Sequence, residues 1–520
     1  MKFNLKDRFT SQLPADPILE NSRRQVSNAC FSYVTPKQTA NPQLLHVSDD
    51  MLQTLGLTKK DSATKEFLNV FTGNSVMVDT KPYAMCYGGH QFGNWAGQLG
   101  DGRAINLAEV EHNNKIWALQ LKGAGETPYS RTADGLAVLR SSVREYLCSE
   151  AMYHLGVPTT RALSLALTGD QVLRDMLYNG NAAYEKGAVV SRVAPSFLRF
   201  GSFQLLAARE DTATLKTLVD YTIKNHFSHL GDPSKETYIA FFKEVAERTL
   251  EMIVHWQRVG FVHGVMNTDN MSILGLTIDY GPYGWLEDYD VDWTPNTTDA
   301  ENRRYRYSNQ PNVGLWNLFQ LANALFPLVN EAAPLEAILD DYKLGYDKAS
   351  LKMMRSKIGL YTEFDSDFKL IQELEANLQL VETDMTIFYR TLANFNNKAP
   401  EEALKLLEDA YYNPDALTNA VKSKWNKWFT AYANRLELEH TAPEKRKQQM
   451  NLVNPKYVLR NYMSQLAIDA AENGDYTLIN ELYTILKQPY NEQQNHNKWF
   501  AKRPEWARHK VGCSMLSCSS

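Results

Sequence analysis

The stretch at residues 263–281, HGVMNTDNMSILGLTIDYG, holds the side chains best suited to chemistry in the 520-residue sequence. Asn270 and Asp279 carry hard oxygen ligands of the kind that Mg²⁺ prefers alongside substrate phosphates. Asp269 directly precedes the Asn and could orient or deprotonate an attacking hydroxyl group. The apolar run at 272–278 predicts a strand or hairpin that leads into Asp279. These residues indicate metal-dependent transfer of a phosphate-containing group, and a polar loop without a chemical role is the alternative.

A Lys and a Glu earlier in the chain suit the binding of phosphate. Lys122 ends a predicted strand, and Glu145 lies on the predicted helix that follows. Kinases place their phosphate-binding Lys on a strand and fix it with a Glu on the next helix. The order Asn270 then Asp279 is also typical of a kinase catalytic segment, although Val265 stands where a kinase keeps its catalytic Asp. A surface Lys and Glu that do not touch are the alternative.

Glycines and arginines gather around these residues in the sequence. Residues 81–102 are rich in Gly, which lets a backbone approach a phosphate closely and offer its N–H groups. Arg103 follows this segment, and Arg192 and Arg199 lie on either side of a Pro. A guanidinium group can hold phosphate oxygens through two hydrogen bonds. Ordinary turns and solvated arginines are the alternative, since the glycines match neither a Walker nor a Rossmann pattern.

Alternating residues predict the strands that position these groups. The runs at 104–111 and 116–121 indicate a β-hairpin with its turn at 112–115. The run GAVVSRVA at 187–194 predicts another strand, which carries Arg192.

Helical periodicity dominates the rest of the chain. Asp134 is a predicted N-cap for a helix whose apolar residues recur at helical spacing, at Leu136, Leu139, Val143 and Leu147. The clearest helix spans 236–259 and is predicted to end at Gly260. Residues 335–490 are helical and amphipathic throughout. A Gly-rich, strand-containing half therefore precedes a helical half.

Composition excludes several classes of protein. The chain is 44% hydrophobic and 22% charged, with a net charge of −5 that is too small to indicate nucleic acid or a membrane surface as a partner. No apolar run reaches the roughly 18–20 residues of a membrane span, and the N-terminus lacks the apolar region of a secretory signal. Five cysteines in a chain of this length do not form a disulfide framework. A reducing cytoplasm is the expected compartment.

Five blocks of the sequence are similar to those of a known protein family. The blocks YGGHQFGNWAGQLGDGRA, LKGAGETPYSR, DGLAVLRSSVREYL, HGVMNTDNMS and IDYGP closely resemble the selenoprotein O family of protein adenylyltransferases. The resemblance implies an α+β, two-lobed protein-kinase-like (pseudokinase) fold with an N-terminal extension and an enlarged helical C-lobe. It further implies that AMP is transferred from ATP to Ser, Thr or Tyr hydroxyls of proteins, with Mg²⁺ or Mn²⁺ and with ATP flipped relative to kinases.

The resemblance also assigns roles to residues. It implies that Asp269 is catalytic, that Asn270 and Asp279 bind the metal, and that Glu145 orients Lys122. The nucleotide contacts that it implies are Gly100, Gly102, Arg103, Lys122, Asp134, Gly135, Arg192 and Arg199.

The C-terminal tail is a separate feature of the family. Many members carry selenocysteine third from the end, where this sequence has Cys518. Cys513 lies five residues earlier, close enough in sequence for a small redox-active disulfide loop. Two unpaired thiols are the alternative.

The expected division of the chain follows the motifs. Residues 1–80 form an N-terminal extension, 81–205 a Gly-rich N-lobe, 206–490 a helical C-lobe with the catalytic loop, and 491–520 the tail. The expected partners are ATP and protein substrates, with no nucleic acid, no membrane and a monomeric chain. The basic and aromatic run at 303–310 is interpreted as packing and solvated charge, or alternatively as a docking site for a protein substrate. A kinase, or a pseudokinase that only binds nucleotide, remains the alternative function.

Overall fold

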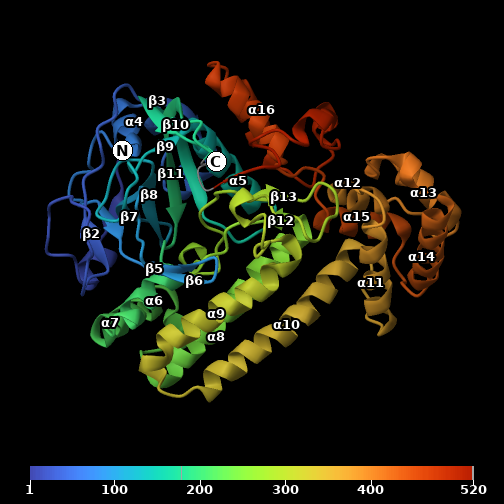
Figure 1. The fold of residues 1–520 in the computed structure, drawn as a ribbon, viewed down its shortest axis with the longest axis horizontal. Coiled ribbons are helices and arrows are strands. Elements are labelled where there is room, and N and C mark those ends of the chain that lie inside the picture. Colours follow the sequence, from blue (N-terminus) through green and yellow to red (C-terminus); the bar gives the residue numbers. More distant parts are fainter. Residues whose placement is uncertain (177–178, 518–520) are drawn as a thin grey trace.

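A large antiparallel sheet and many helices make up the mixed α and β architecture of the computed structural model, which describes residues 1–176 and 179–517 (Figure 1). The sheet runs in the order β2-β4-β7-β8-β11-β10-β3, with β1 paired to β7 and β9 to β11. Its strands are β1 (Asn4–Lys6), β2 (Phe31–Tyr33), β3 (Gln43–Val47), β4 (Tyr83–Met85), β7 (Ala104–His112), β8 (Lys115–Lys122), β9 (Ala137–Val138), β10 (Arg161–Arg174) and β11 (Ala183–Ala194).

The predicted strands that lead to the site are confirmed. Strands β7 and β8 form the expected hairpin, with Ala104 opposite Lys122 and His112 opposite Lys115. Asn113 and Asn114 close it with φ of 50° and 61°, left-handed values that Asn tolerates and that a tight hairpin turn needs. The predicted strand at 187–194 forms the second half of β11, which pairs with β8 next to Lys122.

Residues 1–80 contribute to the same sheet. Strands β1, β2 and β3 pair with β7, β4 and β10 respectively. Four short helices complete the segment: α1 (Phe9–Gln12), α2 (Asp49–Thr54), α3 (Lys59–Ser62) and α4 (Lys65–Thr72). The sheet therefore draws its edges from this segment and its centre from residues 83–194.

Helix α5 (Leu139–His154) lies against the sheet and carries Glu145. The prediction that Asp134 caps this helix is wrong, because the helix begins five residues later, after Val138. Asp134 instead accepts a hydrogen bond from Leu136 N at 3.0 Å within the preceding loop. Strand β9 occupies the two residues between that loop and the helix, and its pairing with β11 delays the helix start.

A group of long helices supports residues 263–281, which are called the catalytic segment below because of the role predicted for them. The predicted helix at 236–259 is confirmed as α8 (Lys235–Val259), which Ser234 caps and Gly260 ends with a left-handed φ of 76°. Helices α9 (Gln310–Val329) and α10 (Ala333–Lys357) pack along α8 (Figure 1). Two shorter helices, α6 (Phe200–Ala208) and α7 (Thr212–His226), connect the sheet to α8.

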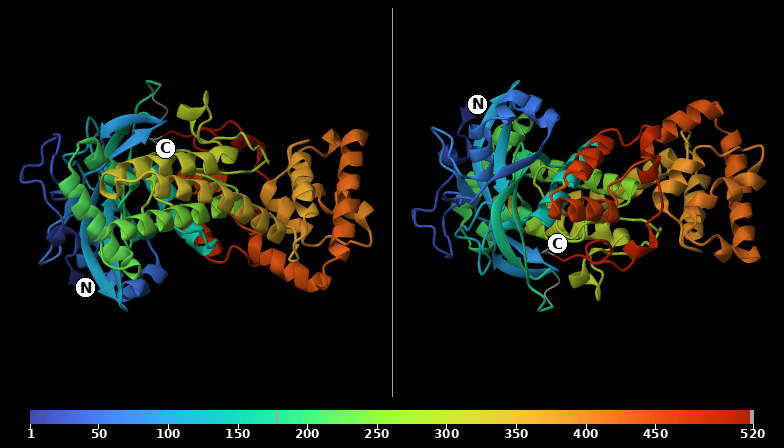
Figure 2. Two further views of the ribbon diagram at one scale, coloured as in Figure 1. Left: turned by 90° about the horizontal axis from the view of Figure 1, so that it is seen from below. Right: turned by 90° about the horizontal axis from the view of Figure 1, so that it is seen from above.

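The predicted helical character of residues 335–490 is confirmed, and the helices between residues 366 and 453 form a second hydrophobic core around Phe388, Trp425 and Trp428. Figure 2 shows this region as the end of the molecule remote from the sheet, whereas α16 and α17 return to pack on α5. These helices are α11 (Ser366–Leu378), α12 (Met385–Leu392), α13 (Ala403–Leu406), α14 (Asn419–Glu437), α15 (Pro443–Val453), α16 (Asn461–Glu472) and α17 (Thr477–Leu486). None of the helices in the described ranges combines the length and apolar character needed to cross a bilayer.

The catalytic segment is irregular. Two short paired strands, β12 (Phe261–Val262) and β13 (Gly284–Trp285), flank it. The run at 272–278 forms a turn at Gly275 in place of a regular strand, and single bridges join Ser272 to Arg199 and Thr277 to Thr159. Ile273 and Ile278 are fully buried, so the apolar residues of this run pack into the core.

His46 on β3 joins three elements and makes stability depend on pH. Its Nδ1 lies 2.6 Å from the Tyr146 hydroxyl on α5, and its ring centroid lies 4.5 Å from that of Tyr483 on α17. Burial lowers the pKa of His46 from 6.5 to about 4. Since the folded-state pKa is the lower one, this histidine stabilises the fold fully above pH 6.5, and the contribution is lost as the pH falls to 4.

We therefore expect His46→Gln to remove a pH-dependent part of the free energy of unfolding. The difference between wild type and variant should shrink by about 3 kcal/mol between pH 7 and pH 4. Urea denaturation at a series of pH values measures it, with exposed His440→Gln as the control substitution. A difference that does not change with pH would contradict the prediction.

Candidate active site

A cavity of about 670 Å³ opens between the sheet and the catalytic segment. Strands β7, β8 and β11 contribute one wall, and the segment from Val265 to Pro282 contributes the other. The cavity is lined by these residues from the sequence analysis: Gly100, Gly102, Arg103, Lys122, Asp134, Gly135, Arg192, Arg199, Asp269, Asn270 and Asp279. Segments that are up to 180 residues apart therefore meet at one place.

Lys122 and Glu145 form the pair that their positions suggested. Lys122 Nζ contacts the Glu145 carboxylate and lies 3.6 Å from Asp279 Oδ1. Both partners are largely buried, so the ion pair is held in one geometry by the sheet and by α5. Burial lowers the pKa of Lys122, and the two carboxylates oppose this effect. The ammonium group therefore faces the cavity from a fixed position.

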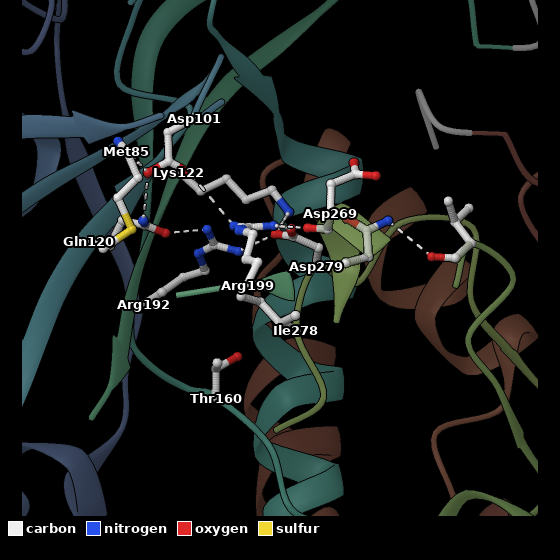
Figure 3. Close-up of polar contacts among 12 residues, drawn as sticks. Met85, Asp101, Gln120, Lys122, Thr160, Arg192, Arg199, Asp269, Ile278 and Asp279 are labelled. Atoms are coloured by element: carbon white, nitrogen blue, oxygen red, sulfur yellow. Dashed lines mark hydrogen bonds and ion pairs between the residues drawn. The ribbon is translucent and has the colours of Figure 1, made fainter. Parts of the chain in front are cut away.

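Asp279 is surrounded by cations (Figure 3). Arg192 Nη1 donates to Asp279 Oδ1 at 2.6 Å, and Arg199 Nη1 contacts Oδ2. Burial would raise the pKa of Asp279, but Arg199, Arg192 and Lys122 together hold it well below the usual range. Its φ of 60° is a left-handed value that is uncommon outside glycine and recurs at functional sites. The carboxylate is therefore ionised and is positioned by its surroundings.

Arg192 also connects the site to the sheet through hydrogen bonds. Its Nη1 donates to Glu145 Oε1 at 3.1 Å, and its Nη2 contacts the side-chain oxygen of Gln120 on β8. One guanidinium group therefore connects the carboxylates of Glu145 and Asp279.

Arg199 precedes α6 and reaches two further acidic residues. Its Nη1 donates to the backbone oxygen of Asp269 at 2.8 Å, and its Nη2 lies 3.6 Å from Asp101 Oδ1. The guanidinium also lies over the Tyr87 ring, 4.6 Å from its centroid. Burial raises the pKa of Asp101, while Arg199 lowers it. No role was predicted for Asp101, although it stands between Gly100 and Gly102 in the sequence.

The carboxylate of Asp269 forms few hydrogen bonds within the cavity. It is 8% exposed, and its Oδ1 has no hydrogen-bond partner among the described residues. Gln91 Nε2 approaches Oδ2 at 3.4 Å. Burial raises the pKa of Asp269 to about 6, which suits a group that accepts a proton near neutral pH.

The catalytic loop is held by local hydrogen bonds. Asn270 Nδ2 donates to the Val265 backbone oxygen at 3.0 Å, which leaves the amide oxygen of Asn270 available as a ligand. His263 Nε2 lies 2.9 Å from Ile278 O, and burial lowers the pKa of this histidine. A neutral His263 that donates to Ile278 fixes the backbone next to Asp279.

Two glycines at the cavity permit close backbone packing. A Cβ on Gly100 would lie 2.4 Å from the Tyr129 ring, and its φ is +90°. A Cβ on Gly135, where φ is +69°, would lie 2.1 Å from Gly125 O. Both positions therefore require glycine for shape, in addition to any contact with a nucleotide.

Asp134 lies at the cavity edge in a salt bridge with a residue that carried no signal in the sequence. Arg174 Nη2 lies 2.7 Å from Asp134 Oδ1, and Arg174 also lines the cavity. Arg103 lies at the same wall, half-buried. This edge therefore presents guanidinium groups beside a carboxylate that already pairs with one of them.

The tail and the basic run lie near the site without lining the cavity. Cys513 is buried, and its predicted partner Cys518 lies outside the described residues. Leu516 N donates to Pro295 O at 3.1 Å, so the tail pairs with the segment that follows the catalytic loop. In the run at 303–310, Tyr305 and Tyr307 are buried.

Comparison with known proteins gives a consistent result. The family model described as "Protein adenylyltransferase SelO" matches residues 17–487. The chain is similar to a protein named "Protein nucleotidyltransferase YdiU" from Flavobacterium johnsoniae, with 62% identity over 99% of this chain and 100% of the relative. Relatives of the same name from Rhodopirellula baltica and Aromatoleum aromaticum are 55% and 52% identical, over 99% or more of each chain.

The Arg199–Asp101 contact predicts a large effect on stability. We expect Arg199→Met to lower the free energy of unfolding by about 3–5 kcal/mol, because it leaves the carboxylate of Asp101 buried without its cation. Urea denaturation without nucleotide measures the loss. The double variant Asp101→Asn/Arg199→Met should lose less than the sum of the two single variants, and strict additivity would contradict the prediction.

Proposed function

Because the chain belongs to the SelO family of protein adenylyltransferases, we propose that it transfers AMP from ATP to Ser, Thr or Tyr hydroxyls of proteins at the cavity around Asp279. The observation that carries the assignment of the site is the contact of one ionised carboxylate, Asp279, with Lys122, Arg192 and Arg199. A triphosphate needs such a set of cations, and an ionised carboxylate among them suits a metal that accompanies the phosphates.

We propose that Asn270 and Asp279 hold Mg²⁺ or Mn²⁺. The residues fit such an ion, because the Asn270 amide oxygen is available and Asp279 is ionised. The described residues contain no group of three or more His, Cys, Asp or Glu that could form an all-protein metal site. Two protein oxygens are the set expected where phosphates and water complete the coordination. The ion, when bound, neutralises charge on the phosphate under attack.

Adenylyl transfer requires that the acceptor oxygen bond to the α-phosphorus while the bond to the β-phosphate oxygen breaks and pyrophosphate leaves. Asp269 accepts the hydroxyl proton, which its free Oδ1 and raised pKa support. Lys122, Arg192 and Arg199 stabilise the negative charge that moves onto the leaving pyrophosphate. This assignment places the α-phosphate beside Asp279, in the flipped orientation that the family resemblance implies.

The site residues support a two-lobed protein-kinase-like fold. Lys122 on a strand pairs with Glu145 on the following helix, and the catalytic segment follows the long helix α8. We propose residues 81–205 as the N-lobe and 206–490 as the C-lobe, with 1–80 as an extension and 491–520 as the tail.

Transfer from labelled ATP tests this function. With wild-type protein, label in the α-phosphate should move onto protein, and label in the γ-phosphate should leave as pyrophosphate. Asp279→Ala should lower the rate by about 100-fold or more, because a preorganised charge is lost from the reacting centre. Asp340→Ala, at an exposed carboxylate, is the matched control.

Other outcomes distinguish the alternatives. Transfer of γ-label in place of α-label would identify a kinase, and ATP binding without any transfer would identify a pseudokinase.

Removal of the metal should stop transfer. We expect EDTA to abolish incorporation of α-label, and added Mg²⁺ or Mn²⁺ to restore it. Asn270→Ala should raise the metal concentration needed for half-maximal rate by about tenfold or more, the effect typical of weakening a ligand set. A metal requirement that Asn270→Ala leaves unchanged would remove this residue from the proposed ligands.

A further inference from the structure

A second cavity lies close to the catalytic loop. It is a groove of about 340 Å³ between α6, α9 and the hairpin of β5 (Gly88–Gln91) and β6 (Asn94–Gln98). Its walls include His90, Trp95, Gln204, Ala207, Ala324 and Pro327.

Strand β5 separates this groove from the nucleotide cavity. Gln91 lines the nucleotide cavity, whereas the preceding His90 lines the groove, as expected for neighbours on a strand. His90 N donates to the Thr268 hydroxyl at 2.8 Å, and a Cβ on Gly89 would lie 2.7 Å from Asp269 Oδ1. The groove is therefore one strand away from the proposed catalytic base.

The groove combines apolar and polar side chains. Trp95 in its wall is 41% exposed, and α9, which supplies the opposite wall, also exposes Phe319 and Phe326 at 47% and 41%. Large exposed apolar side chains on the elements that form a cavity indicate a binding surface. A large apolar side chain of a partner fits this groove.

The groove also contains one buried hydrogen-bond acceptor without a partner. Gln204 is 4% exposed, yet its Oε1 has no partner in the described part of the chain. A buried acceptor without a partner is costly. A backbone N–H of an extended peptide would satisfy it.

A positive charge lies at one end of the groove. The rings of Trp95, His90 and Trp316 form a series with centroids 5.0 Å and 5.3 Å apart. The Arg304 guanidinium lies 4.7 Å from the Trp316 ring. Asp299 accepts a hydrogen bond from the Arg304 backbone N–H at 3.0 Å, but in the described part of the chain no ion pair joins the Arg304 side chain to a carboxylate. An acidic side chain of a partner would complement it.

We propose that this groove docks an extended segment of the protein substrate. A large apolar side chain enters between Trp95 and Pro327, an acidic side chain faces Arg304, and a hydroxyl a few residues away reaches Asp269. This inference rests on the proposed function and adds to it a sequence preference in the substrate. A small apolar ligand would use neither Arg304 nor the Gln204 acceptor, which favours a peptide as the occupant.

Synthetic peptides of about 12 residues, which span about 40 Å when extended, test the proposal. Each carries one Ser, Thr or Tyr, with or without a Leu and a Glu at positions two to four residues away. We expect kcat/KM for transfer of α-labelled AMP to be about tenfold higher when Leu is present, the effect of burying one such side chain. Equal rates for all peptides would overturn the proposal.

Variants at exposed positions test whether the sequence preference of the peptide arises at this groove. Ala208→Glu, at the exposed end of α6, should obstruct the groove and remove the preference for Leu while ATP binding, measured by thermal shift, is unchanged. Arg304→Glu should exchange the preference for Glu in the peptide for a preference for Lys. Trp95→Ala should weaken the preference for Leu, and Trp506→Ala, at a Trp with 47% exposure elsewhere on the surface, is its matched control.

Binding without chemistry separates this inference from the proposed function. Fluorescence anisotropy of a labelled Leu-containing peptide in the absence of ATP should show binding that Ala208→Glu weakens by about tenfold. Unchanged binding would overturn the proposed docking groove even if AMP transfer to protein is observed, whereas absence of α-label transfer to any protein or peptide would refute the proposed function itself. A change of oligomeric state in Ala208→Glu would identify a second copy of the chain as the occupant and would also overturn the proposal.

Discussion

The carboxylate of Asp279 faces the cavity between the sheet and the segment that carries it, and its charge is balanced by cations from other elements. Lys122 comes from β8, Arg192 from β11 and Arg199 from the residue before α6. A buried ion without its partner is strongly destabilising, so these elements have to stay together. The sheet is thereby held against the catalytic segment by charge as well as by apolar packing.

The same interactions prepare the site for a polyanion. Glu145 and Asp101 share the cations with Asp279, so the positive charges are compensated before any nucleotide binds. A nucleotide phosphate that approaches Lys122 therefore meets a side chain already fixed in place. Preorganisation of this kind avoids the cost of reorienting charges during the reaction. Under the proposed function, Asp269, Asn270 and Asp279 supply the acid–base and metal-binding groups, so an Asp at position 265 is not needed.

Local patterns predict those parts of the fold that depend on neighbouring residues. The hairpin of β7 and β8 and the helix α8 follow from alternation, periodicity and the turn-forming and capping residues at their ends. The helix cap at Asp134 could not be judged in this way, because Arg174, which lies 40 residues later, binds that carboxylate. The run at 272–278 is apolar because it is buried, and burial alone does not distinguish a strand from an irregular segment.

The residues of the site divide in the same way, into those that a local sequence pattern identifies and those that it does not. Residues with a recognisable position in a motif, such as Lys122 and Asp279, are visible in the sequence. Asp101 and Gln120 act through contacts made across the sheet, and no local pattern identifies such contacts. The family resemblance supplied the roles, whereas the distances and charges came only with the tertiary structure.

Helix α5 has a consequence for regulation. Of its 16 residues, 13 are buried, because the sheet covers one side and α16 and α17 cover another. Many kinases are switched off when the corresponding helix swings outward and withdraws its Glu from the Lys. Here Glu145 cannot leave Lys122 unless α5 separates from both neighbours, which would expose a large apolar area. Packing of α5 therefore opposes separation of Glu145 from Lys122, and under the proposed function regulation would act on access of ATP or of the acceptor protein.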